Sequence, residues 1–161
     1  AIALNNLGLA CTMVRAVDKG IKYCSLALQQ DTGFTLAKNN LNWAKSEEKK
    51  IQTEIDSLEK APQENRSIDY YTKLGLIYSY IGKRSKSNDA YKAILKLDEK
   101  NAVAYNNIAC NYIEMKEFDN AKQALQSAIT IAPDVQLYKN NLAWAQDEEK
   151  KSKAGRGVTA Q

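Results

Sequence analysis

The sequence contains no histidine and has only two prolines, seven glycines and three cysteines among 161 residues. Without histidine, the usual zinc sites and nucleophiles activated by an imidazole are excluded. An odd number of irregularly spaced cysteines argues against a disulfide framework. The chain also lacks a glycine-rich phosphate loop and an apolar run long enough to span a membrane. We therefore expect no enzyme activity, no metal, no cofactor and no membrane span.

The residues that are present favour a folded helical protein. Apolar residues make up 44% of the chain and charged residues 26%, a balance typical of soluble globular proteins. With so few glycines and prolines, the abundant Ala, Leu, Lys, Gln and Glu predict long helices joined by tight turns. The net charge is only +4, and basic residues are interleaved with acidic ones, so we expect no nucleic-acid partner.

The start of the chain and its cysteines bear on where the protein acts. Ala1 opens directly into helical sequence, with neither an initiator Met nor a signal peptide, and this indicates an excised piece of a longer protein. The absence of disulfide patterning favours a cytoplasmic location.

A shift of 101 residues places the chain on itself. The segment KNNLNWA at 38–44 returns as KNNLAWA at 139–145, and EEKK at 47–50 returns at 148–151. Such a period is typical of repeat proteins, in which each unit is too small to bury its own apolar face and must stack on a neighbour.

Two consecutive segments show a second, shorter repeat. Residues 68–101 carry two apolar stripes at helical spacing with a turn at Gly82 between them, and residues 102–135 repeat both stripes. The small residues Gly75 and Ala109 occupy the same position in the two first stripes, where two helices would cross closely.

These features resemble the tetratricopeptide repeat (TPR). Residues 1–34 match the pattern as well, although Cys11 replaces the usual Tyr and Thr32 the usual Pro. The resemblance implies an all-α, right-handed superhelical solenoid of antiparallel helix pairs, closed by solvating or capping helices. It places TPR hairpins at 1–34, 68–101 and 102–135.

Residues 35–60 depart from this pattern. No Gly or Pro interrupts them, so we expect one long helix of about 25 residues, roughly 37 Å; the alternative is a degenerate TPR bent near Glu48 to Lys50. We expect a hairpin plus long solvating helix at 1–60, a linker at 61–67, two hairpins plus a capping helix at 68–152, and a disordered tail at 153–161.

Asparagine pairs recur in the first helix of the units, although asparagine is a poor residue for a helix interior. The pairs are Asn5-Asn6, Asn39-Asn40, Asn106-Asn107 and Asn140-Asn141. The resemblance implies that the second Asn of each pair faces the concave groove and grips a bound peptide; alternatively, each Asn bonds to the adjoining helix and only tightens the stack. The candidate partner-binding residues are Asn6, Asn40, Lys73, Asn107, Asn141, Tyr80 and Cys110.

We therefore expect a scaffold or adaptor that binds a segment of another protein in the concave groove. The alternative is a structural module that self-associates as a homo-oligomer, through the solenoid ends or through a stripe of Ile51, Ile55 and Leu58 on the long helix. A third possibility is a targeting arm of an enzyme whose catalytic part lies outside this sequence. Trp43 and Trp144 either anchor a partner or cover the last hairpin of a stack.

Overall fold

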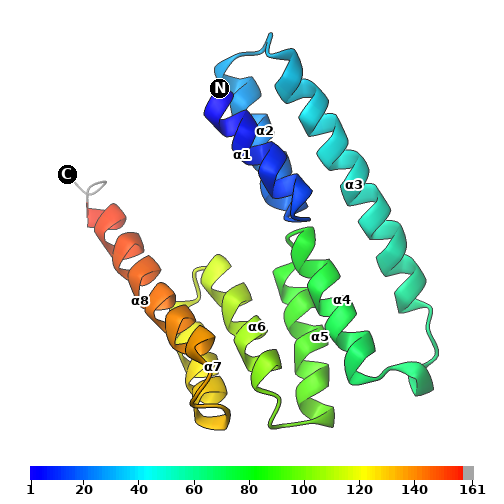
Figure 1. Cartoon of the computed structure of the whole chain (residues 1–161), viewed down its shortest axis with the longest axis vertical. Helices are drawn as coiled ribbons and strands as arrows, with labels where there is room; N and C mark the ends of the chain where they lie inside the picture. The colour runs from blue at the N-terminus through cyan, green and yellow to red at the C-terminus, as the bar shows by residue number, and fades with distance from the viewer. Residues whose placement is uncertain (158–161) are drawn as a thin grey trace. The chain divides into compact units, whose positions relative to one another are not determined.

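The computed structural model describes residues 1–157, which form eight α-helices and one short 3-10 helix (Figure 1). The predicted all-α class with antiparallel helix pairs is confirmed. The chain divides into two compact units: unit 1 contains residues 1–65 and 76–83, and unit 2 contains residues 66–75 and the chain from Arg84 onward. The segment 76–83 therefore belongs with the first hairpin, although the sequence placed it in the second domain.

Unit 1 is built on three helices. They are α1 (Ile2–Met13), α2 (Val17–Gln30) and α3 (Thr35–Glu59). Helix α2 packs against both α1 and α3, and α1 also lies beside α3. Helix α3 is continuous over 25 residues, without a bend that would divide it into a helix pair. The 3-10 helix, Gln63–Asn65, follows it.

Unit 2 repeats this arrangement and has the first part of α4 (Ile68–Tyr80) and all of α5 (Arg84–Leu97) before it. The helices that follow are α6 (Ala102–Glu114), α7 (Phe118–Ile131) and α8 (Gln136–Gly157). Each of the last three packs against its predecessor, and α6 also lies beside α8, as α1 lies beside α3. Helix α8 continues to Gly157, where the sequence predicted a disordered tail from residue 153; residues 158–161 of that prediction lie outside the described residues.

All three hairpins turn in the same way. The second residue after the first helix has a positive φ: 63° at Arg15, 73° at Gly82 and 63° at Lys116. The next residue then donates its backbone N–H to the carbonyl five positions earlier, which satisfies an otherwise open helix end. These bonds run from Ala16 to Cys11, from Lys83 to Tyr78 and from Glu117 to Tyr112, each with an N···O distance of 2.9 Å.

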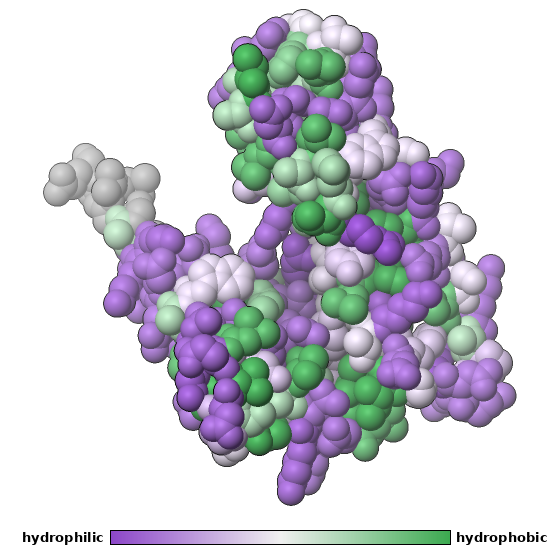
Figure 2. All heavy atoms as spheres, in the orientation of Figure 1, coloured by the Kyte–Doolittle hydropathy of each residue, from purple (hydrophilic) through white to green (hydrophobic). Residues whose placement is uncertain are grey.

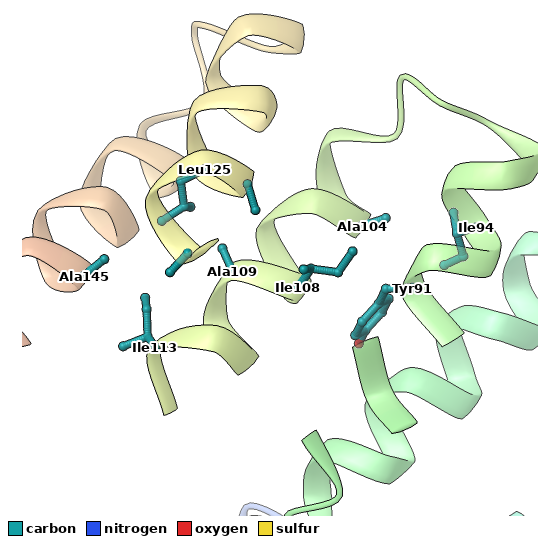
Figure 3. Packing of buried hydrophobic residues seen from close by; sticks show 10 residues of the cluster. Tyr91, Ile94, Ala104, Ile108, Ala109, Ile113, Leu125 and Ala145 are labelled. Atoms are coloured by element: carbon teal, nitrogen blue, oxygen red, sulfur yellow. The ribbon is translucent and has the colours of Figure 1, made fainter. Parts of the chain in front are cut away.

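The two helices of each hairpin cross where a small residue faces a larger one. In the hairpin of α4 and α5 the pair is Gly75 and Tyr91, and a Cβ on Gly75 would lie 2.7 Å from Tyr91 Cζ. One repeat later the pair is Ala109 and Leu125, both fully buried in the core drawn in Figure 3. The glycine thus makes room for a ring that an alanine would exclude.

The second half of α3 is covered within unit 1. Gln52, Ile55 and Glu59 lie on one stripe of the helix. Lys83 Nζ donates to Gln52 Oε1 at 2.6 Å, the Tyr78 hydroxyl donates to the Glu59 carboxylate, and Ile55 is fully buried. Ile51 is buried as well and Leu58 is partly buried, so the stripe that the sequence offered as an alternative surface for self-association is largely covered within unit 1.

Helix α8 does not carry this apolar stripe. At the offset of 101 residues, Ser152 and Arg156 stand where α3 has Ile51 and Ile55. Because Ser152 is polar, this position of α8 needs no apolar cover, unlike Ile51 of α3.

Candidate functional site

One side-chain hydrogen bond is repeated in both units. Asn40 Nδ2 donates to Asn5 Oδ1 at 2.9 Å, and Asn141 Nδ2 donates to Asn106 Oδ1 at 2.7 Å. Both acceptor side chains are buried. The bonds join α1 to α3 and α6 to α8, so Asn40 and Asn141 have the helix-tightening role that the sequence left as an alternative.

Around these bonds each unit presents a surface that we call the amide face. It consists of residues at i, i+4 and i+7 on two adjacent helices, a spacing that keeps them on one side of each helix. In unit 1 it comprises Ile2, Asn6 and Leu9 of α1 with Leu36, Asn40 and Trp43 of α3. In unit 2 it comprises Val103, Asn107 and Cys110 of α6 with Leu137, Asn141 and Trp144 of α8.

The apolar members of the amide faces are open to solvent at matching positions. The exposed fractions are 69% for Ile2 and 56% for Val103, 61% for Leu36 and 54% for Leu137, and 38% for both Trp43 and Trp144. Asn6 is exposed and Asn107 is partly exposed. Because none of these residues is charged, the faces suit apolar and hydrogen-bonding contacts rather than a charged ligand.

In unit 1 the Trp43 side chain forms a hydrogen bond with the Glu47 carboxylate. The Lys50 ammonium lies 2.7 Å from Glu47 Oε1 and lowers the pKa of that carboxyl, and a hydrogen bond from the Trp43 side chain lowers it further. Trp43 and Glu47 are one helical turn apart, so the bond orients the indole on the face.

Cys110 has an apolar character in the amide face of unit 2. Burial raises the pKa of its thiol, and the nearby Glu114 carboxylate raises it further, so the thiol stays protonated at neutral pH. Asn141 Nδ2 lies 3.7 Å from its sulfur. Cys110, Asn107 and Asn141 are therefore members of one surface.

The remaining two predicted residues lie elsewhere. Lys73 is exposed on α4. Tyr80 lies in unit 1, where its ring centroid is 5.0 Å from the Arg15 guanidinium carbon. Arg15 follows the C-terminal end of α1, so the structure does not group Tyr80 with Asn6 and Asn40.

The sequence reasoning missed a buried polar cluster between α5 and α6. Asn111 Nδ2 donates to Ser87 Oγ and to Asn88 Oδ1, both at 2.8 Å, and Ser87 Oγ donates to the Gly75 carbonyl at 2.8 Å. All three side chains are buried. The cluster ties three helices together rather than facing a ligand.

An ion pair between Lys122 and Glu149 joins α7 to α8. Glu149 accepts hydrogen bonds from Lys122 at 2.8 Å and from Lys153 at 2.5 Å. These bonds lower the pKa of Glu149 to about 2, with Lys122 as the larger cause. The same carboxylate lines an open hollow of about 390 Å³ with Lys116, Asp119 and Lys153. Acids and bases neutralise each other there, so the hollow does not favour a charged ligand.

We expect Glu149→Gln to flatten the acid limb of the stability profile. The folded-state pKa lies below the unfolded one, so ionised Glu149 stabilises the fold above its usual pKa and loses that effect as the pH falls toward 2. Melting temperatures measured from pH 5 to pH 2 should fall less steeply in the variant. A profile identical to that of the unaltered chain would contradict the role given to this carboxylate.

Residues 1–157 contain neither a membrane-spanning helix nor a cluster of side chains that could hold a metal ion. In that range no helix is both long and apolar enough to cross a membrane. No group of three or more Cys, Asp or Glu side chains there is arranged to hold a metal ion.

Comparison with known families identifies the repeats. The sequence model of the tetratricopeptide repeat family matches residues 68–101 and 102–135, the two ranges predicted above. Residues 68–135 carry two tetratricopeptide repeats. TPRs are helical repeats of protein-interaction scaffolds, so the chain is a module of that general kind.

Solved structures agree with the TPR fold. "Crystal structure of MamA protein" is 21% identical, with a TM-score of 0.57 and coverage of 92% of this chain and 82% of that one. "MamA MSR-1 C2" is 14% identical, with a TM-score of 0.53 and coverage of 99% and 98%. A further "Crystal structure of MamA" is 22% identical, with a TM-score of 0.51 and coverage of 89% and 91%. At these identities the likeness concerns the fold alone. No curated protein matches the chain.

Proposed function

We propose that this chain is a scaffold and that each of its amide faces binds an extended segment of a partner protein. The observation that carries the proposal is the recurrence of one exposed set, apolar residue, amide and Trp, at matching positions in both units. Solvent-exposed Trp and aliphatic side chains are costly to leave in water, and Trp is favoured where partners dock.

The amides suit recognition of a peptide backbone. A carboxamide both donates and accepts hydrogen bonds, so it can pair with a peptide group whatever side chain follows. Asn40 and Asn141 each use one N–H for the bond to the neighbouring helix, and each carboxamide has a second N–H and a carbonyl oxygen. In this proposal Asn6 and Asn107 contact the segment directly, and the apolar members set its side-chain preference.

Lys73 and Tyr80 have secondary roles in the proposal. The Lys73 ammonium is exposed and would pair with a carboxylate of the partner. Tyr80 lies against Arg15 and would contribute only to a partner that extends past the end of α1.

The test is affinity measured beside stability. A partner segment is captured with the purified chain and identified by mass spectrometry, and its Kd is then measured as a synthetic peptide. The double variant Asn6→Ala with Asn107→Ala should raise that Kd about tenfold while leaving the melting temperature nearly unchanged. Asn106→Ala is the matched control, since it removes a buried acceptor and should lower the melting temperature. Unaltered affinity in the double variant would refute the proposal.

Self-association is a second candidate, favoured by the composition of α1. This helix contains no charged residue, and Ile2 and Met13 are both 69% exposed. Light scattering over a hundredfold concentration range decides it, because a mass that stays at the monomer value contradicts a homo-oligomer. The expected absence of enzyme activity and the expected cytoplasmic location stay predictions.

A further inference from the structure

The first hairpin has cysteine at two positions where the other two hairpins have large side chains. Cys11 of α1 is equivalent to Tyr78 and Tyr112, and Cys24 of α2 is equivalent to Tyr91 and Leu125. Tyr91 and Leu125 fill the helix crossings of their hairpins. The crossing of α1 and α2 therefore contains two small thiol side chains in place of two bulky ones.

The backbone of α2 lies directly against α1 at this crossing. A Cβ on Gly8 would lie 2.5 Å from Cys24 Sγ and 2.9 Å from the Cys24 backbone nitrogen. At the equivalent Gly75, by contrast, the three nearest atoms all belong to the ring of Tyr91. Cys11 follows Gly8 by three residues, so it lies on the side of α1 that contacts Cys24. Such a close approach favours a disulfide, which requires Cα atoms roughly 4.4–6.8 Å apart.

The two thiols differ in their access to solvent. Cys24 is fully buried, whereas Cys11 is partly exposed. Tyr112, which is equivalent to Cys11, is also partly exposed although α5 precedes its helix, so this access is a property of the position within the hairpin. Burial raises the pKa of the Cys24 thiol, and the charge of a Cys11 thiolate raises it further, so the two sulfur atoms lie within electrostatic reach of each other.

The surface around Cys11 admits a small anionic reagent. Helix α1 contains no charged residue, and Figure 2 shows hydrophobic residues among the surface atoms over this helix. No carboxylate of α1 therefore repels an anionic disulfide such as oxidised glutathione.

We propose that Cys11 and Cys24 form a reversible disulfide by exchange with oxidised glutathione, a low-molecular-weight disulfide. The bond joins α1 to α2 and makes the first hairpin a redox-sensitive element of unit 1. Neither cysteine belongs to an amide face, so the inference does not rest on the proposed function.

The exchange takes place in two steps. Cys11 loses its proton to solvent, and its sulfur attacks one sulfur of oxidised glutathione; the S–S bond of the reagent breaks, and one glutathione leaves and takes up a proton. Cys24 then loses its proton, and its sulfur attacks the Cys11 sulfur, which releases the second glutathione. Two protein thiols are oxidised to one disulfide, and one glutathione disulfide is reduced to two thiols.

The experiment uses the unaltered chain. The chain is incubated with oxidised glutathione, the remaining thiols are blocked with N-ethylmaleimide, and the product is digested with trypsin for mass spectrometry. We expect residues 1–15 to be linked to residues 23–38, without glutathione on either peptide, and dithiothreitol to separate them. The oxidised chain should melt about 5 °C above the reduced chain, because the bond restrains the unfolded state.

Two variants test the order of the steps. Cys24→Ala should leave Cys11 as a lasting mixed disulfide with glutathione, because no second thiol resolves it. Cys11→Ser should leave Cys24 without glutathione, because the Cys24 sulfur is buried. This difference assigns the attacking role to Cys11 and the resolving role to Cys24.

Four outcomes would overturn the proposal. The first is that both thiols of unit 1 stay unreacted, and the second is that glutathione remains on Cys11 while Cys24 is intact. The third is a bond from Cys11 to Cys110 or to a second chain. The fourth is an oxidised chain that melts below the reduced chain, since the bond would then form only by distorting the hairpin.

Discussion

Gly75→Ala is expected to lower the free energy of unfolding by about 2–3 kcal/mol. The added Cβ would lie 2.7 Å from Tyr91 Cζ and 2.9 Å from a second ring carbon. The ring is rigid and buried against α6, so it cannot move aside at little cost. Urea unfolding followed by circular dichroism measures the loss.

Tyr91→Leu should relieve that strain when it is introduced with Gly75→Ala. The pair then has the composition of Ala109 and Leu125, which pack in the next hairpin without exposure. A double-mutant cycle should give a coupling of at least about 1 kcal/mol in the stabilising direction. Gly33→Ala is the control, since its Cβ would meet only Asp31 Oδ1 at 3.4 Å. Additive losses at the two positions would refute the steric explanation.

Asn111→Ala is expected to cost about 2–3 kcal/mol of unfolding free energy. It removes two hydrogen bonds of 2.8 Å, leaves Asn88 Oδ1 buried without its donor and opens a small cavity. Chemical unfolding of the purified variant gives the value.

Asn88→Ala tests the origin of that cost. In the Asn111→Ala background it should be much less damaging than in the unaltered chain, because removing both members of a polar pair leaves no orphaned group. If the two losses simply add, the buried amides do not act as a pair.

The hairpins could be predicted from the sequence because their signals are local. The ranges 68–101 and 102–135 followed from apolar spacing and the turn, and the family comparison returns the same ranges. The small residues Gly75 and Ala109 were recognised as helix crossings, which the structure confirms. Each of these features is decided by residues within one hairpin.

The roles of the asparagines could not be resolved in the same way. Consecutive residues of a helix point about 100° apart, so one Asn of a pair can face the adjoining helix while the other faces solvent. The sequence shows the pairs but not the rotation of each helix against its neighbour. That rotation places Asn5 and Asn106 inside and makes Asn40 and Asn141 their donors.

Two features of the structure could not be predicted from the repeated sequence pattern. The sequence offered the stripe of Ile51 and Ile55 as an alternative surface for self-association, but both residues are buried within unit 1, which includes the short and distant segment 76–83. Asn111 has no asparagine at its equivalent position, so a search for recurring residues passes over it. The cover of α3 depends on packing between segments that are distant in sequence, and the role of Asn111 depends on a contact that is not repeated.

The same amide–amide hydrogen bond occurs twice in this chain, from Asn40 to Asn5 and from Asn141 to Asn106. Each bond can therefore serve as the reference for the other. Truncating each donor in turn removes the same chemical group from two surroundings that share temperature, solvent and concentration. The difference between the two losses then measures the influence of the surroundings alone, a quantity that ordinarily requires two different proteins.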